Sequence, residues 1–227
     1  DVYKRQLFNG EDLMKLSVKE RADHIAYVMQ NPNLMLSQTL IADEVALGLR
    51  ARAVPEDEIR RRSEEALRVC GLWPFRNWPV SALSYGQKKR LTVAAILSLN
   101  PQMIILDEPT AGQDYRHYTE IMEFLLSLSQ RGLTIVLITH DMHLMQEYAE
   151  RAVVFTDGHI LADDSPSSVL TRPELIAEAC LKETSLFALA KLCEIAAPEQ
   201  FVQRFMDFER GLREQQSRKG VNRGQPL

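Results

Sequence analysis

The stretch Pro101–Asp114, PQMIILDEPTAGQD, decides the fold that we expect for this chain. Its apolar run Met103–Leu106 is short and rich in strand formers, which is typical of a parallel strand buried on both faces. Asp107 and Glu108 follow at the carboxyl end of that strand, and ligands of open α/β sheets bind at this edge. The two carboxylates offer one hard-oxygen ligand for Mg²⁺ and one candidate general base, or else a pair that faces water.

Two other predicted strands also end in polar groups. Residues 24–29, HIAYVM, precede Gln30, and residues 134–139, TIVLIT, precede His140. A polar side chain at a strand end can reach a metal or a phosphate, although a lone glutamine more often caps its turn and a lone histidine is more often structural. Because parallel strands end at the same edge of a sheet, we expect both side chains to gather at one rim with the acidic pair.

The segment Leu83–Arg90, LSYGQKKR, predicts a helix start that attracts an anion. Ser84 and Gln87 have the spacing of a capping box, and Gly86 leaves room for a ligand near the backbone. Three consecutive cations follow in the first turn, where the helix dipole disfavours positive charge. A bound phosphate would explain this arrangement, and a solvated cap followed by a charged face would have the same pattern.

The composition narrows the class of protein. The chain has 227 residues, a net charge of −4 and 45% hydrophobic residues, as in one large globular domain with an appendage. A net acidic chain argues against nucleic acid as the main partner. No apolar run approaches the roughly 20 residues that span a bilayer, so a membrane role requires a partner. Cys70, Cys180 and Cys193 lack metal-like spacing and indicate reduced thiols.

The two ends of the chain differ in character from its middle. The first six residues, DVYKRQ, fit nothing that follows, and Leu7–Gly10 resembles a hairpin strand entering a turn, so we expect the chain to open inside a domain. Apolar residues over 182–212 recur at helical spacing and predict two helices that meet at Pro198, with an apolar stripe that needs a partner surface. Residues 213–227 are polar, and we expect them to be disordered.

Together these motifs resemble the ATPase subunits of ABC transporters. The resemblance covers about residues 7–181, and the motifs stand in the family's order at compatible spacing. LSYGQ (83–87) is similar to the signature motif, MIILDEP (103–109) to the Walker B strand, AGQD (111–114) to the D-loop, Gln30 to the Q-loop glutamine and ITHD (138–141) to the switch histidine. The segments VMQNPN, ADEVALGLR and ITHDM are most similar to those of the energy-coupling-factor subgroup, which powers the uptake of vitamins and metal ions.

The resemblance implies an α/β fold of the P-loop-NTPase type. We expect an ABC ATPase domain over 1–181, with a parallel core sheet and a helical subdomain at about 32–98, followed by the C-terminal helical extension. The sequence contains no GxxxxGK[ST] phosphate loop. Family spacing places that loop and the first strands upstream of residue 1, so the chain as given is expected to bind ATP poorly. Tyr85 and Gln113 depart from the usual Gly and Leu of the family.

The resemblance also assigns roles to the four strand-end residues. Asp107 would hold Mg²⁺ through its water shell, and Glu108 would polarise the water that attacks ATP. Gln30 would sense the metal and the water and couple them to the transporter. His140 would contact the γ-phosphate. The implied reaction is ATP hydrolysis.

The remaining site residues imply a partner ATPase. Ser84, Gly86 and Gln87 would bind the γ-phosphate of ATP held by the opposite subunit, and Asp114 would lie at the dimer interface. The implied assembly is a head-to-tail homo- or heterodimer of ABC ATPase subunits or domains. It would be bound peripherally to transmembrane transporter subunits at the cytoplasmic face of the cell membrane. In this family a separate membrane protein selects the solute.

Two alternatives remain open at the level of sequence. The first is a catalytically impaired partner that supplies only its signature motif in trans; the missing phosphate loop favours it, and the intact Glu108 and His140 argue against it. The second is a non-transport ABC ATPase acting on DNA or chromosomes. Such proteins carry a long coiled coil between Q-loop and signature, whereas residues 31–83 show no sustained heptads.

Overall fold

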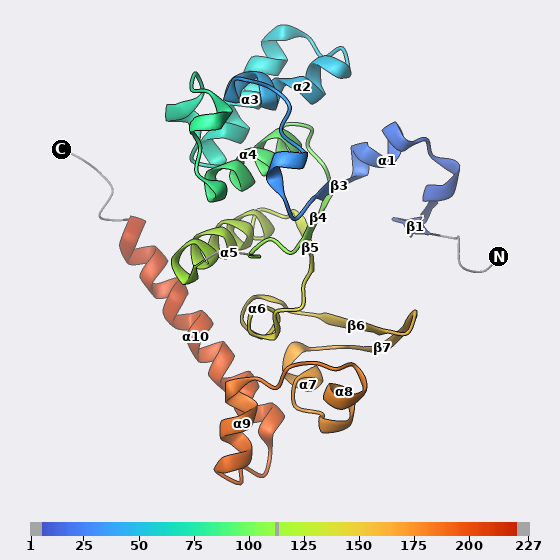
Figure 1. The fold of residues 1–227 in the computed structure, drawn as a ribbon, viewed down its shortest axis with the longest axis vertical. Helices are drawn as coiled ribbons and strands as arrows, with labels where there is room; N and C mark the ends of the chain where they lie inside the picture. Colours follow the sequence, from blue (N-terminus) through green and yellow to red (C-terminus); the bar gives the residue numbers. More distant parts are fainter. Residues whose placement is uncertain (1–5, 112–113, 222–227) are drawn as a thin grey trace. The chain divides into compact units, whose positions relative to one another are not determined.

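The computed structural model describes residues 6–111 and 114–221 and divides into two compact units (Figure 1). Unit 1 ends at Ile138, and unit 2 begins at Thr139. The domain boundary expected at residue 181 stays a prediction. Within unit 2, α7 (Pro166–Val169) packs against α10 (Pro198–Val221), so the expected extension contacts the segment before it.

Unit 1 is built on a parallel sheet in the order β3 (Ile25–Val28), β4 (Met103–Asp107) and β5 (Thr134–Ile138). The strand predicted at Met103–Leu106 is β4, and it lies in the middle of the three. Ile104 and Leu106 are fully buried on one face, whereas Met103 and Ile105 are only half-buried on the other. The expected burial on both faces is therefore complete on one face alone. The carboxyl ends of the three strands lie at one edge of the sheet, which is where a ligand site of this architecture forms.

A short hairpin and a capped helix precede β3. The hairpin joins β1 (Leu7–Phe8) to β2 (Glu11–Asp12), and Gly10 takes a positive φ of 85° in its turn. The 3₁₀ helix η2 (Leu13–Lys15) follows, and then α1 (Val18–His24). Ser17 forms a capping box with Glu20: its hydroxyl accepts from the Glu20 N–H, and the Glu20 carboxylate accepts from the Ser17 N–H.

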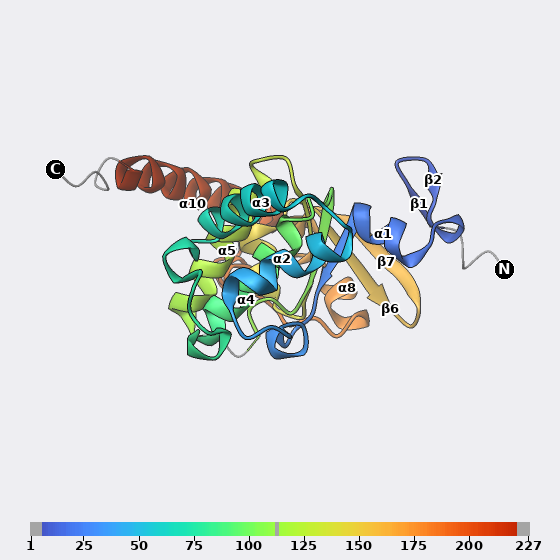
Figure 2. The ribbon, with the colours of Figure 1, turned by 90° about the horizontal axis from the view of Figure 1, so that it is seen from above.

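A helical group lies between β3 and β4 in the sequence, within the range where a helical subdomain was expected, and the subdomain itself stays a prediction. Its helices α2, α3 and α4 pack on one another, as Figures 1 and 2 show. Their shared core contains fully buried side chains such as Ile41, Leu49, Leu67 and Leu91. The elements are η3 (Pro32–Leu34), α2 (Ile41–Ala51), α3 (Glu56–Val69), η4 (Trp73–Phe75), η5 (Val80–Ala82) and α4 (Tyr85–Leu97).

Helix α5 (Tyr115–Ser129) lies between β4 and β5 in the sequence. Ile121, Leu125 and Leu128 are buried, and their spacing is that of one face of an amphipathic helix. The helix begins at Tyr115, and Asp114 is its N-cap.

Unit 2 has its own core. After α6 (Met142–Tyr148), the antiparallel pair β6 (Ala152–Thr156) and β7 (His159–Asp164) forms a hairpin. The short helices α7 and α8 (Pro173–Glu178) follow. The core cluster consists of Met142, Ala152, Val154, Ala162, Val169, Leu170 and Leu175.

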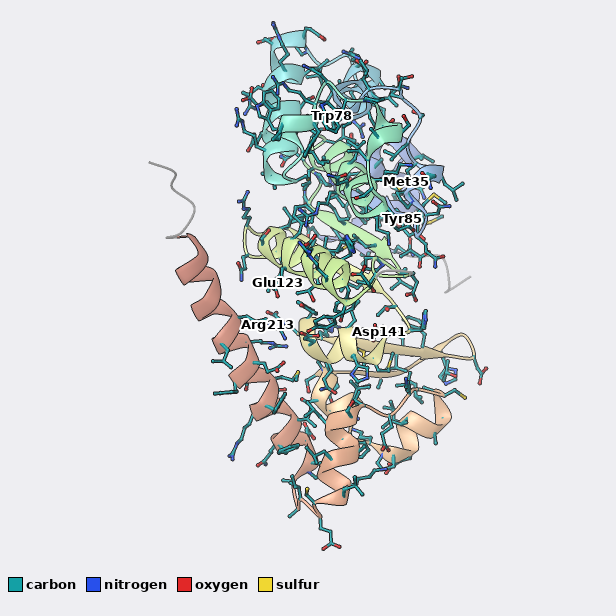
Figure 3. The ribbon with its side chains drawn as sticks, turned by 60° about the vertical axis from the view of Figure 1, so that its left-hand side comes forward. Met35, Trp78, Tyr85, Glu123, Asp141 and Arg213 are labelled. Carbon is teal, nitrogen blue, oxygen red and sulfur yellow. The ribbon has the colours of Figure 1, made fainter. Side chains whose placement is uncertain are left out.

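The last two helices, α9 (Ser185–Leu192) and α10, pack against each other, and α10 begins at Pro198. The predicted disordered tail starts too early, because α10 continues to Val221; residues 222–227 lie outside the described residues. Arg213 helps to explain the longer helix, since it pairs with Glu147 and lies 4.9 Å from the ring centre of Tyr148 on α6 (Figure 3). Among the described residues, no helix combines the length and apolar character that a bilayer crossing requires.

Candidate functional site

The acidic pair lies where β4 gives way to a sharp turn. Asp107 is the last residue of the strand, and Glu108 takes a left-handed backbone conformation with φ of 44°. Such a conformation costs a residue other than glycine about 1–2 kcal/mol. It is held here by two backbone hydrogen bonds, because the Glu108 N–H donates to the Ile138 carbonyl (2.9 Å) and the Glu108 carbonyl accepts from the Ala111 N–H (3.2 Å).

The Asp107 carboxylate is oriented by a tyrosine that sequence reasoning missed. The Tyr27 hydroxyl on β3 donates to Oδ2 of Asp107 at 2.8 Å, and this hydrogen bond raises the pKa of Tyr27. The register explains the contact: Tyr27 pairs with Ile105, and Asp107 follows Ile105 by two residues on the same strand face. Only the register in which β3 pairs with β4 could have revealed the role of this tyrosine, and a single sequence does not contain that register.

Gln30 lies two residues beyond the end of β3, at the same sheet edge as the acidic pair. Its backbone carbonyl accepts a hydrogen bond of 3.1 Å from the Tyr85 hydroxyl. Tyr85 is the first residue of α4 and is labelled in Figure 3. Tyr85 therefore links the start of α4 to Gln30.

The start of α4 is capped as predicted. The Ser84 hydroxyl accepts from the Gln87 N–H (3.3 Å), and the Gln87 side-chain oxygen accepts from the Ser84 N–H (3.0 Å). A Cβ atom added at Gly86 would meet only the ring of His117, at an ordinary 3.8 Å. The first turn is therefore open to close approach beside Gly86, and Ser84 is exposed.

The three cations of this turn all have protein partners. Lys88 donates to the Asn33 side chain (2.9 Å), and Arg90 lies 3.8 Å from the Glu120 carboxylate. Lys89 is buried and donates to the Glu108 carbonyl (3.0 Å) and to the Pro109 carbonyl. Because the protein itself supplies partners for the three cations, their presence does not require a bound anion. The feature of α4 that suits a phosphate is its open, capped first turn.

Asp114 is the N-cap of α5. Its carboxylate accepts from the His117 N–H (3.0 Å) and lies 2.8 Å from Nδ1 of His117. These contacts with His117 lower the pKa of Asp114. Gly112 and Gln113, and with them the expected departure at Gln113, lie outside the described residues.

His140 belongs to unit 2, whereas Gln30, Asp107 and Glu108 belong to unit 1. It lies between Ile138, the last residue of β5, and Asp141, the N-cap of α6. The structure thus brings three of the four predicted strand-end residues to one edge of the parallel sheet. The approach of His140 to that edge stays a prediction.

The donor set at this edge suits a hard cation that keeps most of its water. Among the described residues, no cluster of three or more His, Cys, Asp or Glu side chains could hold a metal ion. Mg²⁺ is commonly bound through one or two carboxylates together with waters and substrate phosphates. The Asp107 carboxylate, fixed by Tyr27, fits that role.

The sequence of the chain is similar to those of known proteins. Residues 4–111 match the family model described as ABC transporter. The chain is 58% identical over 207 residues to CPE1583 of Clostridium perfringens. It is 56% identical over 207 residues to a protein of Enterococcus faecalis. Both relatives carry the name ABC transporter ATP-binding protein. Each alignment covers 91% of this chain but 36% of the relative, so the chain spans about a third of the length of these relatives.

A solved structure extends the match to most of the chain. The chain is similar to cbiO1 of Clostridium perfringens, described as part of the ABC transporter complex cbiONQ. The TM-score is 0.69 at 33% identity, and the match covers 83% of this chain and 75% of cbiO1. The parallel sheet, the ordered motifs and this similarity show that the chain belongs to the family of ABC transporter ATP-binding proteins.

Proposed function

We propose that the protein carrying this chain hydrolyses ATP with Mg²⁺ and so energises a membrane importer of the energy-coupling-factor type. The observation that carries the proposal is the Asp107–Glu108 pair at the carboxyl edge of three parallel strands, with Gln30 at the same edge. The similarity to cbiO1, part of a transporter complex, supports the importer role. We further propose that the ATPase domain spans 1–181, with the helical subdomain at about 32–98.

Asp107 and Tyr27 act on the metal in this proposal. The Tyr27 hydroxyl holds one carboxylate oxygen of Asp107, which fixes the rotamer of a group that binds the water shell of Mg²⁺. When bound, Mg²⁺ neutralises charge on the β- and γ-phosphates. Gln30 lies at the next strand end and reports the state of the metal and the water to the transporter.

Glu108 acts on the attacking water. Its backbone is fixed in a bent conformation by the Ile138 carbonyl and the Ala111 N–H, so its carboxylate starts from a defined position. A carboxylate held beside the γ-phosphate accepts a proton from water or aligns it for in-line attack. His140 contacts the γ-phosphate from the segment after β5.

A second ATPase subunit or domain completes the site. Ser84, Gly86 and Gln87 form an open, capped helix start, and the backbone N–H groups of such a turn bind phosphate. We propose that this turn takes the γ-phosphate of ATP held by the opposite ATPase and that Asp114 lies at their interface. The pair binds transmembrane subunits peripherally, at the cytoplasmic face of the cell membrane.

The direct test is Glu108→Gln in the whole protein that carries this chain. We expect ATP turnover to fall by about 100-fold or more, with ATP binding retained, because the amide cannot accept the proton. The matched control is Glu178→Gln on the exposed end of α8, which should leave turnover unchanged. Full turnover in Glu108→Gln would contradict the proposed base.

A mixing experiment addresses the impaired-partner alternative. A subunit that only supplies its signature turn would show no turnover alone but would restore turnover of a second ATPase, and Ser84→Arg would abolish that restoration. The proposed active subunit should instead lose its own site with Glu108→Gln and the opposite site with Ser84→Arg. Measurement of turnover in mixed pairs separates the two patterns.

A further inference from the structure

Lys89 reaches from the first turns of α4 into the turn that carries Glu108. Its side chain is buried, with 5% of the residue exposed, and its Nζ donates to the Glu108 carbonyl at 3.0 Å and to the Pro109 carbonyl. A buried ammonium is costly unless it is hydrogen-bonded, and burial lowers the pKa of Lys89 to about 8. The two carbonyl oxygens are the partners that make this burial tolerable.

The Glu108 carbonyl is the point at which the turn is held. It accepts from the Ala111 N–H (3.2 Å) and from Lys89, while the residue itself has the strained φ of 44°. Removal of the Lys89 amine would leave the Pro109 carbonyl without this donor and the Glu108 carbonyl with a long hydrogen bond. Since a left-handed residue persists only where its surroundings fix it, the turn would then relax toward other conformations.

The same helix start also contacts the end of the neighbouring strand. The ring centre of Tyr85 lies 5.6 Å from Lys89 Nζ, and the Tyr85 hydroxyl donates to the Gln30 carbonyl. One turn of α4 therefore supports the backbone at both Gln30 and Glu108, and it is the turn that begins with the signature-like LSYGQ.

We propose that Lys89 is a positioning residue that fixes the backbone of Glu108 and ties the signature helix to the catalytic turn of its own subunit. The catalytic part of this inference rests on the proposed function, in which Glu108 acts on water. The structural part, that Lys89 holds the turn, stands on the contacts alone and has a separate test.

Hydrogen exchange of residues 107–111 tests the structural part without reference to activity. In the whole protein, Lys89→Met should speed exchange in this segment by about ten-fold, since the Ala111 N–H loses its fixed acceptor. Lys89→Arg should restore much of the protection, and Lys19→Met, at an exposed lysine on α1, should change nothing. Unchanged exchange in Lys89→Met would overturn the proposal; Lys89→Gln serves the same purpose if the methionine variant does not fold.

ATP turnover tests the catalytic part. Lys89→Met should lower kcat by about 10- to 100-fold, because a misplaced catalytic group costs about that much, while KM for ATP stays nearly constant and arginine rescues activity. If Lys89 acts through Glu108, the double variant with Glu108→Gln is no slower than Glu108→Gln alone. If the effects of the two substitutions on kcat were fully additive, Lys89 would not act through Glu108, and its role as a positioning residue would be wrong. Full activity of Glu108→Gln would reject the proposed base, whereas the exchange result would still decide whether Lys89 holds the turn.

Discussion

Glu44 on α2 shows how a single buried carboxylate fixes a connection. It is 4% exposed and accepts from the backbone N–H groups of Ser37 (2.8 Å) and Gln38 (2.6 Å). Glu44→Ala should lower the free energy of unfolding by about 2–4 kcal/mol, because two N–H groups lose their acceptor. Asp43→Ala is the matched control: its exposed ion pair with Arg50 should contribute less than about 1 kcal/mol. Urea unfolding of both variants measures the difference, and equal losses would contradict the assignment.

Cys70 gives the chain a pH dependence with a definite sign. It is 1% exposed, and burial raises the pKa of its thiol from 9.0 to about 12. Between those values the unfolded chain releases a proton that the folded chain keeps, so the contribution to stability is constant below pH 9 and is lost as pH rises toward 12. Urea unfolding from pH 8 to 10, compared with Cys70→Ala, measures this slope.

The same burial predicts a pattern of thiol reactivity. Iodoacetamide at pH 8 should label Cys180 and Cys193, which are exposed, and should reach Cys70 only in urea. Labelling of Cys70 in the folded chain at a rate similar to the other two would contradict its burial.

At the scale of elements, α6 depends on its cap. Asp141 accepts from the N–H groups of His143 (2.9 Å) and Leu144 (3.2 Å) and is labelled in Figure 3. Asp141→Ala should therefore cost about 1 kcal/mol, whereas Asp141→Asn keeps an acceptor and should cost much less. Thermal unfolding compares the two variants. An equal loss in both would assign the effect to the charge of Asp141 and not to the cap.

Local signals predicted the element boundaries well. The capping box at Ser84 involves only four consecutive residues, and it forms as expected. The N-cap of α5 was missed because Asp114 was assigned only to the D-loop motif. The contacts Tyr27–Asp107 and Lys89–Glu108 join residues 80 and 19 apart in sequence, so they depend on strand register and on the packing of α4, which no local pattern contains.

At the scale of the whole molecule, the two units have separate cores. Leu170 is fully buried in the core of unit 2, and Leu170→Ala should destabilise that unit by about 2–5 kcal/mol. The amides of β3, β4 and β5 should keep their protection, because they belong to unit 1. Hydrogen exchange resolves both regions, and Leu192→Ala, at an 83% exposed position, is the neutral control. Loss of protection in both regions would show that they unfold together.

Composition and motifs predicted the α/β class and the family, but not which helices pack together near the end of the chain. The packing of α7 against α10 joins segments about 30 residues apart in sequence. The prediction of disorder after residue 212 depended on the polar character of these residues and not on their helix propensity. Anchoring of Arg213 on α6 is a tertiary contact that favours the longer helix.

The edge of β5 that faces away from β4 affects how this chain behaves in concentrated solution. In the part of the chain that the structure describes, β5 pairs with β4 alone, and Val136 and Ile138, which share one face of β5, are 37% and 50% exposed. An apolar strand with open amides recruits any other extended segment that reaches it. Preparations of these 227 residues should therefore precipitate more readily than a preparation in which a further strand pairs with that edge of β5.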